Sequence, residues 1–390
     1  MSILVVAAAR PNFMKVAPLL QAFDAAGVET TLVHTGQHYD AAMSDQFFAD
    51  LGMRQPDVHL GCAGGSHAET TARVMLAFDA VVAERNPNAV VVVGDVDSTL
   101  ACGLVAAKRN VPLAHVEAGL RSGDRTMPEE VNRIVVDALA DWLFTPSADA
   151  TQNLVREGVD PKRIFWVGNV MADSLLRTMT TLDVDAELAR HRVRREGYAL
   201  LTLHRPSNVD DMETFTEILT GVAEVARSTP VLFPVHPRTA PQLLLPQVQK
   251  ILSATSGLRL LQPVGYRECA ALQSAAAFVM TDSGGLQEET TILGVPCLTL
   301  RESTERPITV TEGTNTVVGT SASAIVDGAA SALAGRHITR TPPVGWEGRA
   351  AERIVEILAT TPAPLDAVRA RPAARASSTV PPQTMRRVRA

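Results

Sequence analysis

The chain has 390 residues, 46% of them hydrophobic and 20% charged, which exceeds one ordinary domain and suffices for two buried cores. Its 42 acidic and 36 basic residues give a net charge of −6, which argues against a protein dedicated to nucleic acid or to an anionic membrane surface. The four cysteines are widely spaced and lack a CxxC pair, so neither a disulfide framework nor a thiolate zinc site is predicted. A reducing, cytoplasmic location is therefore expected.

The first half of the sequence alternates short apolar runs with stretches of helical periodicity. The N-terminal run ILVVAAA lacks a preceding basic region, so it predicts a first buried strand and not a targeting segment, and no apolar run is long enough to span a membrane. Strands that are apolar on both faces and separated by helices are typical of a parallel sheet covered on both sides. Residues 1–169 are therefore predicted to form a Rossmann-like α/β domain. Its strands are expected at 3–8, 30–35, 89–94, 112–117, 142–146 and 163–168.

The same alternation restarts after residue 169 and predicts a second Rossmann-like domain over 170–345. A helical pattern over 346–360 could close this domain or cross back to the first one. Residues 361–390 are rich in Pro, Ala and Arg and have little to bury, which predicts a disordered tail; the alternative is an arm for an anionic partner. Strands of the second half are expected at 198–204, 230–236, 258–263, 277–282 and 295–300.

Several common catalytic motifs are missing from the chain. It contains no GxGxxG, GxxxxGK[ST], GxSxG or HExxH pattern. The usual nicotinamide, phosphate-loop, serine-hydrolase and zinc-protease functions are therefore not predicted. We expect neither a cofactor nor a metal.

Polar residues that follow the strands of the first half are the candidates for chemistry, because ligands of open α/β sheets collect at the carboxyl ends of strands. Arg10 and Lys15 flank a helix expected to start near residue 13, and two cations there suit a phosphate, although solvated loop charges would look the same. Asp95 follows a strand and a glycine, whereas Asp97 is also compatible with a helix cap. Glu117 lies at the end of the next strand.

Two further acids, Glu129 and Glu130, follow Pro128 at the start of a predicted helix. Acids at this position are favoured by the helix dipole alone, so each is compatible with a purely structural role.

The second half offers an anion site and two histidines. Ser283, Gly284 and Gly285 join a strand to a helix, where exposed amides suit a diphosphate, and Glu288 and Glu289 follow one turn later, within reach of ribose hydroxyls. His204 and His236 each end a strand at the same edge, although either alone is compatible with an ordinary loop histidine.

Together, these segments resemble the non-hydrolysing UDP-N-acetylglucosamine 2-epimerases, which have the two-domain GT-B fold with parallel sheets facing a central cleft. The resemblance covers residues 3–360. It rests on RPNFMK (10–15), TGQH (35–38), GDVDST (94–99), HVEAGLRS (115–122), MPEEVNR (127–133), LHRP (203–206), TDSGGLQEE (281–289) and TERP (304–307).

The resemblance implies a role for each matching residue. The acid/base carboxylates correspond to Asp95, Glu117 and Glu129, with His204 beside them. Residues implied to bind UDP are Arg10, Lys15, Ser283, Gly284, Gly285, Glu289 and Arg306. Gln37, Arg205 and His236 match a second site at which some members bind an activating UDP-sugar. The resemblance also implies a homodimer.

The implied activity is the interconversion of UDP-GlcNAc and UDP-ManNAc in polysaccharide biosynthesis, through elimination of UDP to 2-acetamidoglucal and its re-addition. This route requires carboxylates to remove and deliver a proton at C2, and a cationic nest for the departing diphosphate. The alternatives are a hydrolysing epimerase that releases UDP and ManNAc, a GT-B glycosyltransferase, and a catalytically silent UDP-sugar sensor.

Overall fold

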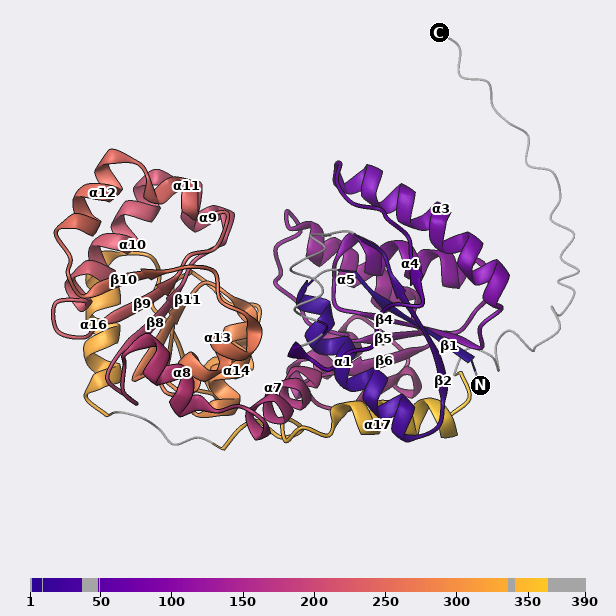
Figure 1. Ribbon diagram of the computed structural model, residues 1–390. Helices are drawn as coiled ribbons and strands as arrows, with labels where there is room; N and C mark the ends of the chain where they lie inside the picture. Colours follow the sequence, from indigo (N-terminus) through magenta and orange to yellow (C-terminus); the bar gives the residue numbers. More distant parts are fainter. Residues whose placement is uncertain (1, 9, 37–47, 49, 336–340, 364–390) are drawn as a thin grey trace, which may run out of the picture.

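The computed structural model describes residues 2–8, 10–36, 48, 50–335 and 341–363. Two parallel sheets lie in separate halves of the chain (Figure 1), which confirms the expected α/β architecture. The first sheet has the order β3-β2-β1-β4-β5-β6-β7. Its strands are β1 (Ser2–Ala7), β2 (Glu29–His34), β3 (Val58–His59), β4 (Ala89–Val93), β5 (Leu113–Val116), β6 (Trp142–Thr145) and β7 (Ile164–Trp166).

The second sheet has the order β10-β9-β8-β11-β12-β13. Its strands are β8 (Ala199–Thr202), β9 (Val231–Pro234), β10 (Leu258–Leu261), β11 (Phe278–Thr281), β12 (Cys297–Thr299) and β13 (Asn315–Val317). The short edge strands β3 and β13 were not expected from the sequence, because two or three residues carry too little apolar pattern to stand out.

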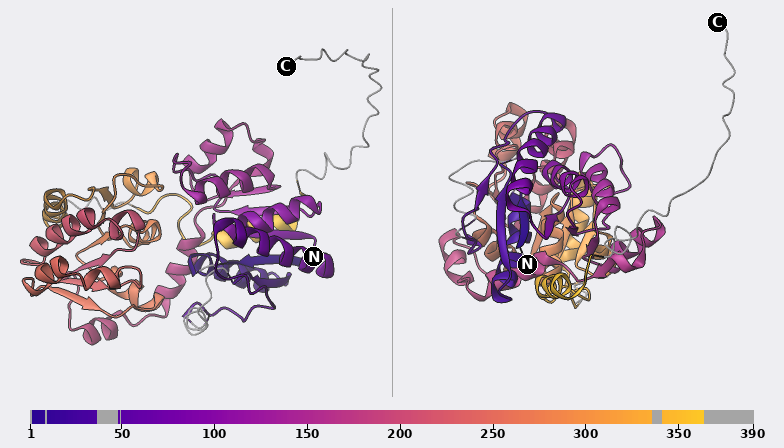
Figure 2. Two further views of the ribbon diagram at one scale, coloured as in Figure 1. Left: turned by 90° about the horizontal axis from the view of Figure 1, so that it is seen from above. Right: turned by 90° about the vertical axis from the view of Figure 1, so that its right-hand side faces the viewer.

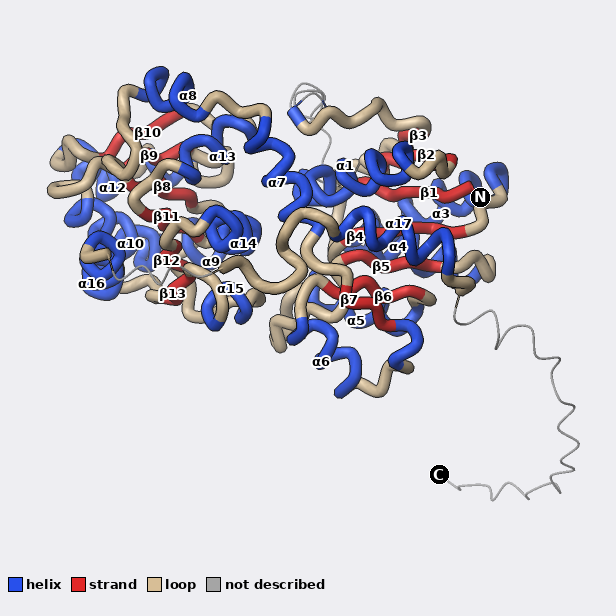
Figure 3. The backbone as a smooth tube through the Cα atoms, turned by 90° about the horizontal axis from the view of Figure 1, so that it is seen from below, coloured by secondary structure: helices blue, strands red, loops and turns tan. Residues whose placement is uncertain are grey.

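Helices cover both faces of each sheet (Figure 3). In the first half, α1 (Arg10–Ala25), α3 (His67–Arg85), α4 (Asp97–Lys108), α5 (Pro128–Leu139) and α6 (Ala148–Arg156) follow the strands. In the second half the helices are α8 (Val184–His191), α9 (Pro206–Val209), α10 (Met212–Val225), α11 (Ala240–Leu243), α12 (Pro246–Ser253), α13 (Tyr266–Ser274), α14 (Gly284–Leu293), α15 (Pro307–Thr311) and α16 (Ala322–Leu333). The helix expected to start near residue 13 begins at Arg10, so Arg10 lies in its first turn.

The strand β1 shows how the sequence builds two cores around one sheet. Ile3 and Val5 pack in a cluster with α1, whereas Leu4 and Val6 pack with α3 and α4 on the other face. This alternation follows from the two-residue period of a strand. Residues 3–8 are all buried, which explains why this segment is continuously apolar.

Two helices follow the points at which the chain passes between the halves (Figures 1 and 2). The helix α7 (Val170–Thr180) packs against both α1 and α14, and α17 (Ala350–Thr360) packs against α1 in the core of the first half. Ala363, which the sequence assigned to the tail, is buried in that core. Residues 364–390 lie outside the described residues.

The chain passes between the halves twice, before α7 and before α17. These two segments are in contact at Gly168 and Gly345. A Cβ at Gly168, whose φ is +94°, would lie 1.9 Å from the carbonyl oxygen of Gly345. The amide of Asn169 donates to the same oxygen at 3.2 Å. A side chain at position 168 is therefore excluded by both space and backbone conformation.

Candidate active site

The register of the first sheet brings Asp95 and Glu117 to one edge. Val93 is the partner of Val116, so the residues that follow β4 and β5 leave the sheet side by side. Gly94 has a φ of +70°, and a Cβ there would lie 3.3 Å from Oε2 of Glu117. Glycine therefore lets the turn after β4 approach the Glu117 carboxylate closely.

Glu117 lies at the centre of a buried charge cluster formed by both halves. Lys15 of α1 contacts Oε2 of Glu117, and Nη2 of Arg306 lies 2.8 Å from Oε1. Burial opposes ionisation of Glu117, but the charges of Lys15 and Arg306 outweigh it and lower the pKa of this carboxyl to about 2. Glu117 also has a φ of +69°, an uncommon conformation for a residue other than glycine.

Arg306 also forms an ion pair within its own half of the molecule. Its Nε lies 3.0 Å from Oε1 of Glu288 in α14, and the same oxygen accepts from Nδ2 of Asn169 at 3.1 Å. Arg306 therefore joins carboxylates from both halves across the space between the sheet edges.

Asp95 is held by a second buried arginine, Arg133 of α5. Arg133 contacts Oδ2 of Asp95, and its Nη1 lies 2.7 Å from Oε2 of Glu130. Glu130 accepts from the amides of Ser122 at 2.9 Å and Gly123 at 3.1 Å. Glu130 thus anchors the loop after β5.

Glu129 has different surroundings from its neighbour Glu130. Its side chain is half-buried, and it has no hydrogen-bond partner among the described residues, whereas Glu130 is fully engaged. Of the two acids, Glu129 is the one available to a ligand.

Asp97 belongs to a supporting network. Its Oδ1 accepts from Nδ2 of Asn132 at 3.2 Å, and its Oδ2 lies 2.8 Å from Nδ1 of His67. Asn132 also donates to the carbonyl of Asp95 at 2.9 Å. Asp97 thus stabilises the turn that carries Asp95.

The second sheet presents a helix N-terminus at the facing edge. Ser283 is the N-cap of α14, Gly284 begins the helix, and a Cβ at Gly284 would have nothing within 4 Å. The space beside Gly284 is therefore open, and an anion near this N-terminus would be stabilised by the helix dipole.

Glu289 is buried like the adjacent Glu288 but has different partners. It is buried beside Tyr266 and accepts a hydrogen bond from Nε2 of Gln273. Burial raises the pKa of Glu289 to about 7, although the Gln273 bond opposes the shift. This carboxyl titrates near neutral pH.

His204 follows β8 and is paired with Asp282, which follows β11. Thr202 and Thr281 are partners in the sheet, and their hydroxyls lie 2.6 Å apart. This register brings Nδ1 of His204 to 2.9 Å from Oδ1 of Asp282.

The residues matched to a second UDP-sugar site lie partly beside His204. The exposed His236 has its ring centroid 5.4 Å from that of His204, and Nη2 of Arg205 lies 3.8 Å from Oε2 of Glu305. Gln37 and the side chain of Arg10 lie outside the described residues.

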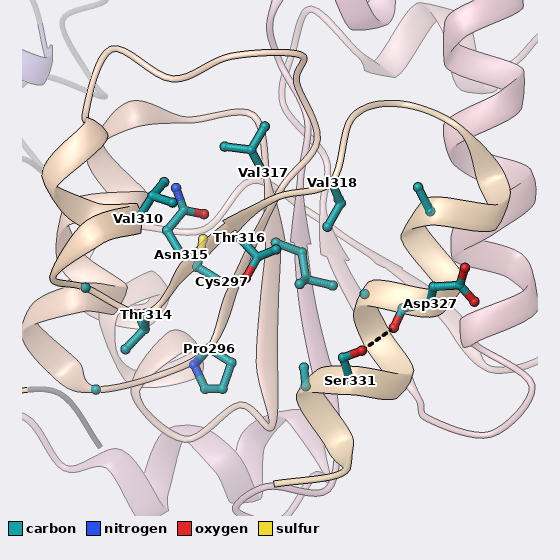
Figure 4. A pocket seen from close by; sticks show the side chains of 16 residues that line it. Pro296, Cys297, Val310, Thr314, Asn315, Thr316, Val317, Val318, Asp327 and Ser331 are labelled. Carbon is teal, nitrogen blue, oxygen red and sulfur yellow. Dashed lines mark hydrogen bonds between the residues drawn. The ribbon is translucent and has the colours of Figure 1, made fainter. Parts of the chain in front are cut away.

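One cavity of the described structure lies away from these residues. A cavity of about 790 Å³ lies between β13 and α16 at the outer edge of the second sheet (Figure 4), lined by residues such as Pro296, Thr316 and Asp327. None of the candidate site residues lines it.

Within the described ranges, one group of three potential metal ligands occurs, away from the carboxylates above: Glu187, His191 and Glu268 on α8 and α13. Arg190 lies 2.9 Å from Glu187 and 3.4 Å from Glu268, so a guanidinium already supplies positive charge there. No helix in the described part of the chain is long and apolar enough to cross a membrane.

Three residues that organise this site were not assigned a role from the sequence: Arg133, Asn169 and Asp282. Glu288 was considered only for ribose, and Arg133 and Asp282 stood unassigned within the quoted motifs. Each is a polar residue within or next to a segment that the sequence predicts to be a strand or helix, and each is buried. A polar residue at such a position is the feature by which they could have been found.

Comparisons with known proteins identify one family. Residues 21–359 match the sequence profile of the family described as UDP-N-acetylglucosamine 2-epimerase. A protein of that name from Methanocaldococcus jannaschii is 37% identical over 363 residues, covering 92% of this chain and 99% of the relative. The UDP-2,3-diacetamido-2,3-dideoxy-D-glucuronate 2-epimerase of Pseudomonas aeruginosa is 39% identical with the same coverage.

Solved structures of proteins with the same name have a similar fold. The M. jannaschii UDP-GlcNAc 2-epimerase in complex with UDP-GlcNAc and UDP has a TM-score of 0.84 at 36% identity, covering 92% of this chain and 99% of that one. The Neisseria meningitidis UDP-GlcNAc 2-epimerase bound to UDP-GlcNAc has a TM-score of 0.83 at 28% identity, covering 92% and 100%. These likenesses confirm the GT-B fold.

Proposed function

This chain belongs to the UDP-N-acetylglucosamine 2-epimerase family, and from that premise we propose that it interconverts UDP-GlcNAc and UDP-ManNAc without hydrolysis. The observation that carries the proposal is the contact of Lys15 and Arg306, one from each half, with the carboxylate of Glu117. Two cations and a carboxylate are thereby held at the point where a diphosphate would leave and a proton would move.

The diphosphate competes with Glu117 for the two cations. Lys15 and Arg306 neutralise Glu117. A bound diphosphate accepts hydrogen bonds from the same two groups and from the first amides of α14, near Ser283 to Gly285. Binding therefore reduces the positive charge available to Glu117 and raises its proton affinity towards that of a useful base.

The elimination step follows from this charge arrangement. The C1–O bond breaks, its electron pair leaves with the β-phosphate, and the positive charge that develops at C1 acidifies the C2 proton. A carboxylate takes that proton, which gives UDP and 2-acetamidoglucal. The candidates for proton transfer are Asp95, Glu117, Glu129 and His204.

The return step inverts the configuration at C2. A second group delivers a proton to the opposite face of C2, and the diphosphate oxygen adds back to C1. The electrons balance without an oxidant, because the bond broken in elimination is remade in addition. Two proton-transfer groups on opposite faces suffice.

Product analysis tests this proposal against its hydrolysing alternative. The protein is incubated with UDP-GlcNAc, and the products are followed by NMR. The proposal expects UDP-ManNAc at equilibrium with UDP-GlcNAc. Stoichiometric release of UDP with free ManNAc would replace it by the hydrolysing reaction, and no turnover without an acceptor would favour a glycosyltransferase.

A second candidate substrate is favoured by one observation. The P. aeruginosa relative, which is 39% identical, is named for UDP-2,3-diacetamido-2,3-dideoxy-D-glucuronate. The chemistry at C1 and C2 is the same for both sugars, so kcat/KM for the two nucleotide sugars decides between them. A kcat/KM at least about tenfold higher for the glucuronate would reassign the substrate.

The proposal includes the organisation of the protein. We infer a division at residues 169/170 and 345/346, supported by the contact of Gly168 with Gly345, and a cytoplasmic location. We also infer a homodimer, as the resemblance implies, and Leu76 of α3, which is 78% exposed between the exposed Ala72 and Ala80, is a candidate contact. Light scattering of the full chain measures its mass directly, and a monomer across micromolar concentrations would exclude the dimer.

A further inference from the structure

The carboxylate of Asp282 is fully buried and is surrounded by donors from the segment that carries His204. Its oxygens accept from the amide of His204 at 3.0 Å, from the amide of Arg205 at 2.9 Å and from Nδ2 of Asn208 at 3.3 Å. The ring of His204 adds a fourth contact, with Nδ1 at 2.9 Å. Asp282 therefore binds both the backbone and the side chain of His204.

These donors keep Asp282 ionised. Burial alone would favour the neutral acid, but the hydrogen bond of His204, together with the two amides, holds the pKa of Asp282 below its ordinary value. A buried carboxylate has no proton to donate, so the hydrogen between it and the imidazole belongs to Nδ1.

The two residues also differ in access. Asp282 is inaccessible, whereas the His204 side chain is 36% exposed. Since Nδ1 is occupied by Asp282, Nε2 is the one ring nitrogen left for a ligand. The ring of His236 packs beside that of His204 and limits its rotation.

We propose that Asp282 is a positioning residue for His204: by holding the proton on Nδ1, it fixes one tautomer and presents Nε2 to the bound nucleotide sugar. The inference rests on the proposed function for the role of His204, but the fixed tautomer is a property of the free protein. The hydrogen bond of one ring nitrogen decides which tautomer is present, and the wrong tautomer disables a catalytic histidine.

A purely structural role for Asp282 is the competing account, because the amides of His204 and Arg205 also need its oxygens. Asp282→Asn separates the two roles. Asparagine keeps the size of the side chain and one acceptor oxygen for the amides. Its NH₂ group donates, so when it faces Nδ1 the imidazole carries its hydrogen on Nε2 instead.

The direct readout is ¹⁵N NMR of His204 in the full chain, assigned by comparison with His204→Gln. We expect the Nδ1–H form in the native protein and a shift towards Nε2–H in Asp282→Asn. A native His204 in the Nε2–H form would overturn the proposal, whether or not the protein is an epimerase. This measurement needs no turnover, so a failure of the proposed function would be seen separately, as absent activity with UDP-GlcNAc.

The kinetic readout is a double-mutant cycle. We expect Asp282→Asn to lower kcat by about tenfold or more with KM changed less than about threefold, and to cost nothing further in a His204→Gln background. The matched control is Asp210→Asn, which removes an exposed carboxylate paired with Arg238 in the same half and should leave kcat unchanged.

Independent effects of the two substitutions on kcat would refute a role that acts through His204. Loss of folding in Asp282→Asn would leave the native tautomer as the deciding measurement.

Discussion

Substitution of Arg306 by alanine tests whether UDP is bound by both halves of the molecule. Arg306 is buried, with its guanidinium 2.8 Å from Glu117 and 3.0 Å from Glu288. A hydrogen bond to a charged group is worth about 1.5 to 3 kcal/mol, so losing one to the diphosphate should weaken UDP binding roughly 10- to 150-fold. Isothermal titration calorimetry with UDP measures this change directly.

The same substitution has a second effect that must be separated from binding. It leaves the buried carboxylates of Glu117 and Glu288 with one cation fewer, and breaking a buried pair typically costs about 3 to 5 kcal/mol of stability. The double variant Arg306→Ala/Glu288→Gln removes one of these unpaired charges and should recover part of the lost Tm while UDP binding stays weak.

Arg267→Ala serves as the control for this experiment. Arg267 is also an arginine of the second half, but its guanidinium is bound by Thr181, with Nη1 at 3.0 Å from the hydroxyl and Nη2 at 2.8 Å from the carbonyl. Its removal should leave the affinity for UDP unchanged. A folded Arg306→Ala protein with a Kd within about twofold of the native value would refute the assignment of Arg306 to the diphosphate site.

Two further predictions concern carboxylates. Glu129→Gln should lower kcat about 10²-fold, the usual scale for losing a general acid or base, without lowering Tm. Glu130→Gln should instead lower Tm by roughly 4 °C or more, because Glu130 binds Arg133 and two amides. Steady-state kinetics and thermal melts distinguish the two variants, and the reverse pattern would exchange the roles of the two acids. Because the pKa of Glu289 is raised to about 7, its contribution to stability is present below its unfolded pKa and is lost as pH rises through about 7. The loss should reach about 3 kcal/mol and be absent in Glu289→Gln, as measured by urea unfolding between pH 5 and 8; parallel pH curves for the two proteins would contradict this.

The sequence predicts the parts of the site that lie next to strands. Asp95, Glu117, His204 and Ser283 each follow a continuous apolar run, and the carboxyl ends of parallel strands meet at one edge. Their approximate neighbourhood therefore follows from the pattern alone. The short strands β3 and β13 lacked such a pattern.

The contacts between distant residues could not be predicted in this way. Nothing in the spacing of Arg133 shows that it reaches Asp95, or that adjacent acids such as Glu129 and Glu130 separate into an available and a buried group. These outcomes depend on the angle at which α5 packs on the sheet. The pairing of Arg306 with Glu117 likewise depends on how the two halves sit together.

The central claim is that C2 is deprotonated and reprotonated during elimination and return of UDP. The most direct test is turnover of UDP-GlcNAc in D₂O, with NMR of the epimerised nucleotide sugar. The account predicts deuterium at C2 of UDP-ManNAc, because a proton held on a carboxylate exchanges with solvent and the opposite face is reprotonated by a different group. Full retention of the original hydrogen at C2 would contradict it.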